Sequence, residues 1–367
     1  LTQHFRSLVA LLGILACIQA KAQVVVFGDD FSDETNAAWT ISGLINASSW
    51  SVSVPNVDWG ARRNTSPQQL ECTNDASATA NMDGYVLVQT PTTDFTAPYN
   101  TTLANGGLVT WTFNMRQIRP DPGGAAGFDA GNYGVAFILA GETASTNSTG
   151  NGYAVVLGQS GNTDPVRLAR YSAGIAGNST VVNIITSNTA GLTDFGNQYL
   201  SIKVTYNPCA GGVWELFVRN DGASGFADPL TGTLVSQGTA TDNAYTGSAL
   251  NMMAAYWQGS TTANQTAFFD NVTVAVNEKP SATLGANPAV CSGTTSANLP
   301  YSNVAGAPNQ YSIDYNAAAN TAGFVDVTNA PLTPSPIVLT VPGMAAPAVY
   351  NATITFTNTT TGCTSPA

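Results

Sequence analysis

The sequence predicts an all-β protein made of two sandwich domains behind an export signal. Short runs of alternating or β-branched residues recur along the chain, and clusters of Gly, Asn, Asp, Pro and Ser separate them. Almost no segment shows the helical period. Hydrophobic residues make up 44% of the chain, which is enough to build a core and argues against disorder.

The N-terminal segment has the pattern of an export signal. Arg6 precedes an apolar stretch at residues 8–18, and Ala20-Lys21-Ala22 offers a small-x-small cleavage site. We therefore expect residues 1–22 to be a signal peptide and the mature chain to be secreted or held at the cell surface. The apolar stretch is shorter than the roughly 20 residues of a membrane span. Lipidation at Cys17 is an alternative, and the start at Leu1 suggests a fragment of a longer protein.

Charge and histidine content restrict the function. Without residues 1–22, nine Lys and Arg remain against 22 Asp and Glu. Nucleic acids and anionic lipids need clustered Lys and Arg, so neither is expected as a partner. The single histidine, His4, lies in the signal. The mature chain therefore lacks histidine-based catalysis and histidine metal sites.

The first domain is expected over residues 23–276. Its predicted strands are residues 24–27, 50–54, 85–89, 108–116, 133–140, 153–158, 166–171, 181–186, 199–206, 213–219, 250–257 and 267–276. This number of strands exceeds an immunoglobulin-type sandwich and is typical of a larger jelly roll. Alternation predicts a core-facing set on three strands, which comprises Val109, Trp111, Phe113, Met115, Leu200, Ile202, Val204, Tyr206, Trp214, Leu216 and Val218.

A second domain is expected after a linker at residues 277–280, where Asn-Glu-Lys-Pro interrupts the strand pattern. Residues 281–367 contain predicted strands at 310–315, 323–327, 337–341 and 349–357. This size and pattern indicate a small sandwich of immunoglobulin-like shape. An alternative is that the given sequence holds only part of this domain. It lacks the Trp that a true immunoglobulin domain has between its cysteines.

Four cysteines lie outside the signal: Cys72, Cys209, Cys291 and Cys363. An even number in an exported chain indicates two disulfides. Position within the domains predicts that Cys291 pairs with Cys363, which leaves Cys72 with Cys209. A metal site of four thiolates is the alternative, but the chain has no CxxC spacing to support it.

Residues 24–276 resemble the concanavalin A-like superfamily, and within it the laminin G-like and bacterial lectin-like branch. The residues that carry the resemblance are Asp29-Asp30-Phe31-Ser32 followed by Trp39, Gly152-Tyr153-Ala154-Val155-Val156-Leu157, Val166-Arg167-Leu168-Ala169-Arg170-Tyr171, Tyr199-Leu200-Ser201-Ile202-Lys203-Val204-Thr205-Tyr206, Trp214-Glu215-Leu216-Phe217-Val218 and Phe269-Asp270-Asn271-Val272-Thr273-Val274. The resemblance implies a jelly-roll sandwich with a carbohydrate-binding or adhesive role. It also implies a structural calcium ion at Asp29 or Asp30 together with Asp270. The alternative is that these carboxylates accept hydrogen bonds from turns.

The second domain resembles repeat modules of secreted proteins and gliding adhesins of the Bacteroidota. Two segments carry this resemblance, Asn287-Pro288-Ala289-Val290-Cys291-Ser292-Gly293 and Thr361-Gly362-Cys363. It implies a spacer in a long extracellular array, with further modules of the same full-length chain as neighbours.

Glycoside hydrolases of this fold carry a Glu-x-Asp-x-Glu strand with two carboxylates about 5 Å apart. The chain has no such strand, and its glutamates are far apart in sequence: Glu34, Glu71, Glu142, Glu215 and Glu278. Nothing indicates a lyase base either. We therefore expect a protein that is not an enzyme.

Sugar binding needs exposed aromatic rings flanked by hydrogen-bonding side chains. Trp59 and Arg62 lie in a polar stretch, although Trp59 could equally pack under a loop. Trp257 follows Tyr256 directly, so one of the two faces away from the core unless both faces of the sheet are covered. Asn132 and Tyr133 are predicted to line a glycan-binding groove together with Trp59, Arg62 and Trp257. Trp39, Trp50, Trp111 and Trp214 are predicted to be core residues.

The hypothesis from sequence is a non-catalytic module that binds extracellular or cell-surface glycans and helps adhesion. The first alternative is a purely structural stalk whose first domain makes protein contacts. The second is an accessory domain of a glycoside hydrolase or lyase.

Overall fold

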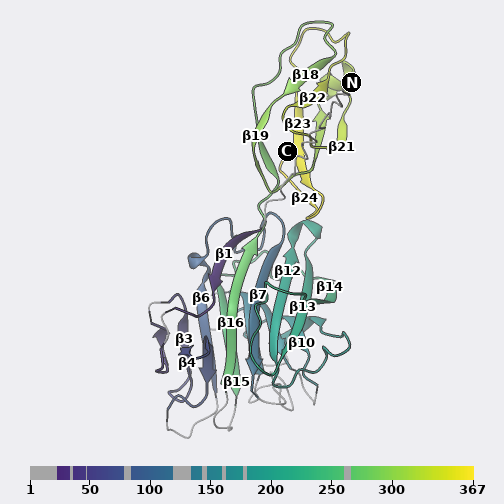
Figure 1. Cartoon of the computed structure of the whole chain (residues 1–367). Coiled ribbons are helices and arrows are strands. Elements are labelled where there is room, and N and C mark those ends of the chain that lie inside the picture. The colour runs from purple at the N-terminus through teal and green to yellow at the C-terminus, as the bar shows by residue number, and fades with distance from the viewer. Residues whose placement is uncertain are drawn as a thin grey trace, which may run out of the picture.

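The computed structural model describes residues 23–33, 36–46, 48–77, 84–118, 134–142, 147–158, 163–176, 180–259 and 266–367. Two eight-stranded antiparallel sheets, here called sheet A and sheet B, build the larger first domain, and a narrower second domain follows (Figure 1). Sheet A contains, in spatial order, β14 (Val235–Thr241), β13 (Val213–Gly222), β12 (Tyr199–Asn207), β7 (Val109–Gln117), β16 (Thr266–Val276), β5 (Gln68–Thr73) and β4 (Gly60–Thr65), with β1 (Val24–Asp29) also paired to β16. Sheet B contains β11 (Val181–Thr186), β10 (Val166–Tyr171), β9 (Gly152–Leu157), β8 (Gly134–Gly141), β15 (Met252–Gly259), β6 (Gly84–Pro91), β3 (Ser51–Ser53) and β2 (Gly43–Leu44).

The all-β jelly-roll prediction is confirmed. Every strand predicted for the first domain is present, with ends shifted by a few residues. The residues predicted to face the core on β7, β12 and β13 are buried between the sheets. The two sheets meet through aromatic rings: Trp214 of sheet A stacks on Trp111 at 5.9 Å and on Tyr153 of sheet B at 4.4 Å, measured between ring centroids. Short 3-10 turns at Thr92–Asp94 and Pro208–Ala210 complete the first domain.

Strands β4 and β5 were missed from the sequence, as were β2 and β14. On β4, the core-facing side carries both Ala61 and Arg63, and both are buried. Arg63 forms ion pairs with Asp29 and Asp33. A charged residue on the inward face hides the apolar alternation that identifies a strand, because its burial depends on a partner distant in sequence.

Sheet B is packed on both faces. The inner face contributes Trp257 and its neighbours to the main core. The outer face carries a second buried cluster formed by Leu87, Ala136, Ile138, Ala154, Val156, Ala169, Tyr171, Ile175, Met252, Ala254 and Tyr256. Consequently, Tyr256 and Trp257 are both fully buried although they point to opposite faces.

The second domain is a small antiparallel β structure with its own cores. Its sheets are β17 (Ser281–Leu284) with β19 (Tyr301–Ala305), β18 (Ser296–Leu299) with β22 (Ile337–Thr340), and β21 (Val327–Pro331), β20 (Gln310–Tyr315), β23 (Ala352–Asn358) and β24 (Cys363–Thr364) in that order. The prediction of a strand at residues 323–327 is wrong. Helix α1 (Ala317–Thr321) and a turn occupy this region, and β21 begins only at Val327. The side chain of Asn316 accepts a hydrogen bond from the backbone N–H of Ala319 and so caps α1.

The disulfide joins the two domains and contradicts the predicted pairing. Cys209 follows β12, Cys363 begins β24, and their Cα atoms are 5.0 Å apart. Cys72 and Cys291 are free thiols. Cys72 cannot pair with Cys209, because β5 turns its side chain into the core between the sheets. Next to the disulfide, the side-chain amide of Asn207 donates to the carbonyl of Thr361 at 2.8 Å.

The predicted linker, residues 277–280, contains no strand and runs against the first domain. A Cβ atom on Gly106 would lie 2.0 Å from the backbone nitrogen of Lys279, so only glycine permits this approach. Within the described residues, no helix is long and apolar enough to cross a membrane.

Candidate functional site: the acidic pocket and the outer face of sheet B

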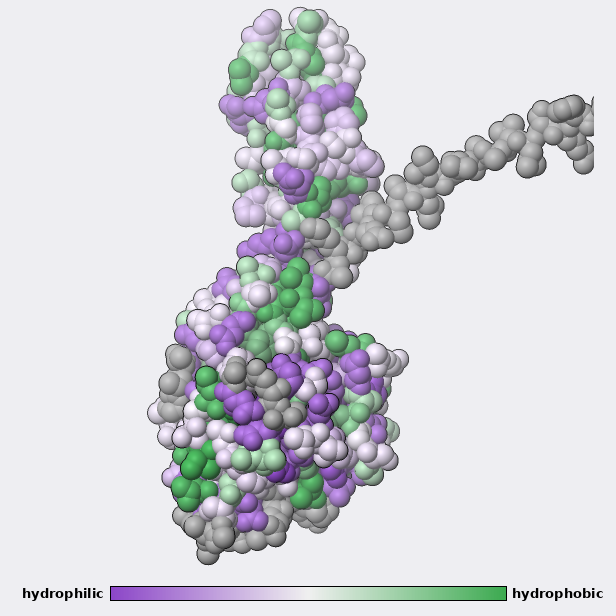
Figure 2. All heavy atoms as spheres, turned by 60° about the vertical axis from the view of Figure 1, so that its left-hand side comes forward, coloured by the Kyte–Doolittle hydropathy of each residue, from purple (hydrophilic) through white to green (hydrophobic). Residues whose placement is uncertain are grey.

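An acidic pocket of about 500 Å³ lies where β1 ends beside β16. Its lining comprises Gly28, Asp29, Asp30, Ser32, Asp33, Asp228, Leu230, Asn271, Val272 and Thr273. The pocket is open and polar, and oxygen atoms dominate its side chains. On the face shown in Figure 2, hydrophilic and hydrophobic residues are interspersed over the larger domain.

The Asp29 carboxylate, at the end of β1, makes three contacts within the first domain. Its carboxylate accepts hydrogen bonds from the Phe31 backbone N–H at 2.7 Å and from the Trp50 indole Nε1 at 2.9 Å. It also pairs at 2.8 Å with Arg63, whose guanidinium is 2% exposed. Burial raises the pKa of Asp29, while these partners oppose the rise. These bonds match the turn and strand-end role considered from the sequence.

Asp30 and Asp270 are in different environments. Hydrogen bonds from Ser32 hold the pKa of Asp30 below its ordinary value. For Asp270, burial raises the pKa to about 7, and the nearby carboxylates of Asp30 and Asp29 add to the rise. Its carboxylate accepts a hydrogen bond from the Asn271 backbone N–H at 2.8 Å. Asp270 is thus a half-buried carboxylate next to like charges, which a cation would stabilise.

The residues fit a calcium ion only in part. Asp30 and Asp270 offer the hard oxygen donors that calcium prefers. Asp29 does not fit, because Arg63, Trp50 and Phe31 already engage its carboxylate. Among the described residues, no three His, Cys, Asp or Glu side chains converge on one point.

The tryptophans predicted to contact a glycan are core residues. Trp59 and Trp257 are both 0% exposed, and their rings lie 4.9 Å apart. The Trp59 ring packs against Gly84, where a Cβ atom would lie 2.8 Å from its Nε1. The prediction that Trp59 and Trp257 are exposed for ligand contact is therefore wrong. Trp59 lies in polar sequence, but the adjoining strands close over it.

Arg62 is largely engaged within the protein. Its Nε donates to Glu71 at 2.8 Å, its Nη1 donates to the Ala37 carbonyl at 2.8 Å, and the guanidinium lies 4.0 Å from the centroid of the Trp39 ring. Asn132 and Tyr133 lie outside the described residues. The three described residues of the predicted glycan groove, Trp59, Arg62 and Trp257, therefore do not form an exposed binding surface.

The outer face of sheet B holds side chains that the sequence did not single out. Tyr85 is half-buried and stacks on Tyr256 with ring centroids 6.0 Å apart. The Tyr256 hydroxyl contacts the side-chain amides of Asn147 at 2.7 Å and Gln258 at 2.6 Å. The adjacent pair Tyr256-Trp257 was the available signal, because alternation forces these two rings onto opposite faces.

Arg167 of β10 lies on the same outer face. Strand pairing places it in one row with Val156, Ala136, Tyr256 and Leu87. The guanidinium donates from Nε to the Gly158 carbonyl at 2.7 Å and from Nη1 to the Asn183 side chain at 3.1 Å. Arg167 is 3% exposed, and its Nη2 has no hydrogen-bond partner among the described residues.

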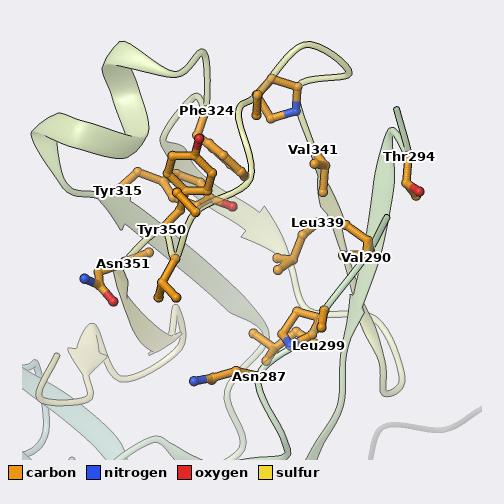
Figure 3. Close-up of a pocket in the computed structure, with 18 of the residues that line it drawn as sticks. Asn287, Val290, Thr294, Leu299, Tyr315, Phe324, Leu339, Val341, Tyr350 and Asn351 are labelled. Carbon is orange, nitrogen blue, oxygen red and sulfur yellow. The ribbon is translucent and has the colours of Figure 1, made fainter. Parts of the chain in front are cut away.

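A separate hollow of about 590 Å³ lies inside the second domain (Figure 3). The rings of Tyr315, Phe324 and Tyr350 gather at one end, with centroids 5.0 and 4.8 Å apart along the series. Leu339 and Val290 line the opposite part. This pocket is largely apolar and lacks the flanking charged groups found in the first domain.

Similar proteins were found only by structure. No protein-family model and no curated protein matches the chain. Lectin II from Ulex europaeus is 11% identical with a TM-score of 0.39, covering 69% of this chain and 99% of the lectin. A lectin from Bauhinia forficata in complex with GalNAc is 9% identical with a TM-score of 0.36, covering 70% and 99%. The potassium-bound carbohydrate recognition domain of Emp46p is 11% identical with a TM-score of 0.38, covering 67% and 94%. Similarity at this level does not assign a ligand, which has to be argued from the residues.

Proposed function

We propose that the first domain binds carbohydrate at the half-buried ring of Tyr85, beside the buried cluster on the outer face of sheet B. The observation that carries the proposal is the stacked pair Tyr85–Tyr256 beside the amides of Asn147 and Gln258. Aromatic rings flanked by amide groups provide the apolar surface and the hydrogen bonds that pyranose rings need. Tyr85 is the half-buried member of the pair and is therefore the ring proposed to contact a sugar. Adhesion without catalysis is the role we propose for this binding.

A glycan array of the purified chain tests this function. Tyr85→Ala is expected to lower binding about tenfold, because a stacked aromatic contact contributes about 1 kcal/mol or more. Tyr199→Ala is the matched control. It removes a tyrosine of β12, in sheet A, that contacts Arg116 and Phe226, and it should leave glycan binding unchanged. Failure of the native chain to bind any glycan would refute the proposal.

We also propose a structural calcium ion held by Asp30 and Asp270. The raised pKa of Asp270 and its like-charged neighbours support this proposal, since a divalent cation relieves their repulsion. Calcium should raise the thermal midpoint of the native chain over an EGTA control, and Asp270→Asn should remove this response. An equal calcium response in both proteins would contradict the assignment.

A structural spacer is the second candidate. The disulfide between Cys209 and Cys363 and the Asn207–Thr361 hydrogen bond favour it, because they fasten the two domains to each other. We propose that the chain is exported, since disulfides persist in oxidising compartments. A chain that shows no glycan binding but keeps one interdomain distance in scattering experiments would favour the spacer over the lectin.

A further inference from the structure

The largest sheet of the second domain has an incompletely paired strand next to its edge. Strand β24 pairs only with the last two residues of β23. The backbone N–H of Ser365 then donates to the Phe356 carbonyl at 2.8 Å, and the Ser365 hydroxyl accepts from the Phe356 N–H at 3.0 Å. Pro366, which has no N–H, follows directly. Among the described residues, no strand pairs with residues 352–355 of β23 on this side.

The backbone of this unpaired stretch is oriented to receive a strand. The bonds to Ser365 show that Phe356 directs its N–H and carbonyl toward the side of β24. Because these directions alternate along an antiparallel strand, Ile354 and Ala352 direct theirs to the same side. Ala352 is exposed and Ile354 is half-buried. The stretch therefore presents donors and acceptors along an edge that solvent reaches.

The opposite edge of the same sheet is protected, whereas this one is not. Strand β21 shifts register against β20, contains Asn329 with a φ of 51°, and ends at Pro331. Bulges and prolines discourage the addition of further strands. Residues 352–355, Ala-Thr-Ile-Thr, contain no proline and no charged side chain. The edge of β23 thus lacks the features that usually prevent strand pairing.

The hollow of about 590 Å³ adjoins this edge, since residues 352–354 of β23 belong to its lining. Leu299, Leu339 and Val290 line it from the other strands and loops (Figure 3). Leu339 and Ile354 pack against both small cores of the domain and yet are only half-buried. A strand paired with β23 would direct every second side chain toward them, because side chains alternate between the two faces.

The surroundings restrict the chemistry of such a strand. Within residues 281–367 the only charged side chains are Asp314 and Asp326, and neither lines the hollow. We propose that the second domain binds an extended segment of another polypeptide, which continues the line of β24 along β23 and carries an uncharged, apolar residue at every second position. Backbone hydrogen bonds supply affinity in this mode of binding, and the hollow selects the side chains. This interaction is separate from the carbohydrate-binding function proposed for the first domain.

The probe is a fluorescent peptide of about six residues with alternating Thr and Val, which spans about 20 Å when extended. Fluorescence anisotropy measures its binding to the whole chain. Two further peptides carry N-methyl groups on one or the other alternating set of amides. One of these two should bind about tenfold more weakly, because its methylated amides face β23, and the other should bind nearly as well as the parent. Equal binding of all three peptides would show that strand pairing is not involved and would overturn the proposal.

Two matched valines locate the site. Val290 and Val338 are both exposed, but only Val290 lines the hollow. Val290→Asp should weaken binding of the parent peptide about tenfold, since it places a charge beside apolar side chains, whereas Val338→Asp should leave it unchanged. An equal effect of the two substitutions, or no binding of the parent peptide to the native chain, would overturn the proposal.

A backbone substitution tests the edge itself. Ala352 is the first residue of β23, a position where proline is tolerated. Ala352→Pro removes the N–H that faces the incoming strand and should weaken binding about tenfold, whereas Ala352→Ser keeps the N–H and should bind like the native chain. Thermal unfolding confirms that both variants are folded. Unchanged binding in the folded proline variant would contradict pairing at this edge.

Discussion

The link between Cys209 and Cys363 gives a quantitative prediction about stability. The two cysteines are separated by 154 positions, and closing a loop of that length restricts the unfolded chain by about 5 kcal/mol in the chain-entropy model. Replacing both with serine should lower the free energy of unfolding by roughly 2–5 kcal/mol. Cys291→Ser is the matched control, since Cys291 is an exposed free thiol, and it should change stability by less than about 0.5 kcal/mol.

Urea unfolding of the three proteins measures these differences, and thiol counting checks the pairing. A chain without residues 1–22 should offer one reactive thiol, Cys291, and a second, Cys72, only in denaturant. Burial raises the pKa of the Cys72 thiol and shields it from reagents. Peptide mapping that recovers Cys291 linked to Cys363 would refute the reasoning. An equal loss of stability in the control would refute it as well.

Three further predictions concern the first domain. Trp59→Ala should cost about 3–5 kcal/mol of unfolding free energy, because it empties a fully buried site against Trp257; a loss below 1 kcal/mol in urea unfolding would show that Trp59 is a surface residue. In calcium-free buffer, the contribution of Asp270 to stability is greatest below its unfolded pKa of 3.8 and decreases as the pH rises to about 7. Asp270→Asn should therefore flatten the decline in thermal midpoint between pH 4 and 7, and an unchanged pH profile would contradict the raised pKa. Asp29→Ala should destabilise the domain by about 3–5 kcal/mol, since it removes a buried partner of Arg63. Asp30→Ala is the control, and an equal loss of thermal stability in both variants would contradict the importance of the Asp29–Arg63 ion pair.

Much of the fold was predictable from local sequence. Alternating residues such as Val109, Trp111 and Phe113 identify their strand and its core face, because pleating turns successive side chains to opposite sides. Strands with a polar inward residue were not predictable. Arg63 is buried only because Asp29 and Asp33 reach it from a segment about 30 residues away, and no local pattern contains that information.

The candidate site was predicted less well than the fold. The acidic residues Asp29, Asp30 and Asp270 were evident in the sequence, and in the structure the carboxylates of Asp30 and Asp29 help to raise the pKa of Asp270. The aromatic candidates were chosen by their polar neighbours along the chain, which does not measure burial. Tyr85 was overlooked because the strands of sheet B carry buried residues on both faces, so alternation does not distinguish their inner face from their outer face.

The sequence by itself therefore determined most of the strand content of the first domain, and it predicts a break at residues 277–280 and a mature chain without histidine. These features depend on residue type and on spacing along the chain. Only the tertiary structure decided that Cys209 bonds to Cys363, that Trp59 is buried, and that Arg167 is buried against neutral partners among the described residues. Each of these properties depends on contacts between segments that are distant in sequence. The packing of the two sheets and the two domains determines those contacts.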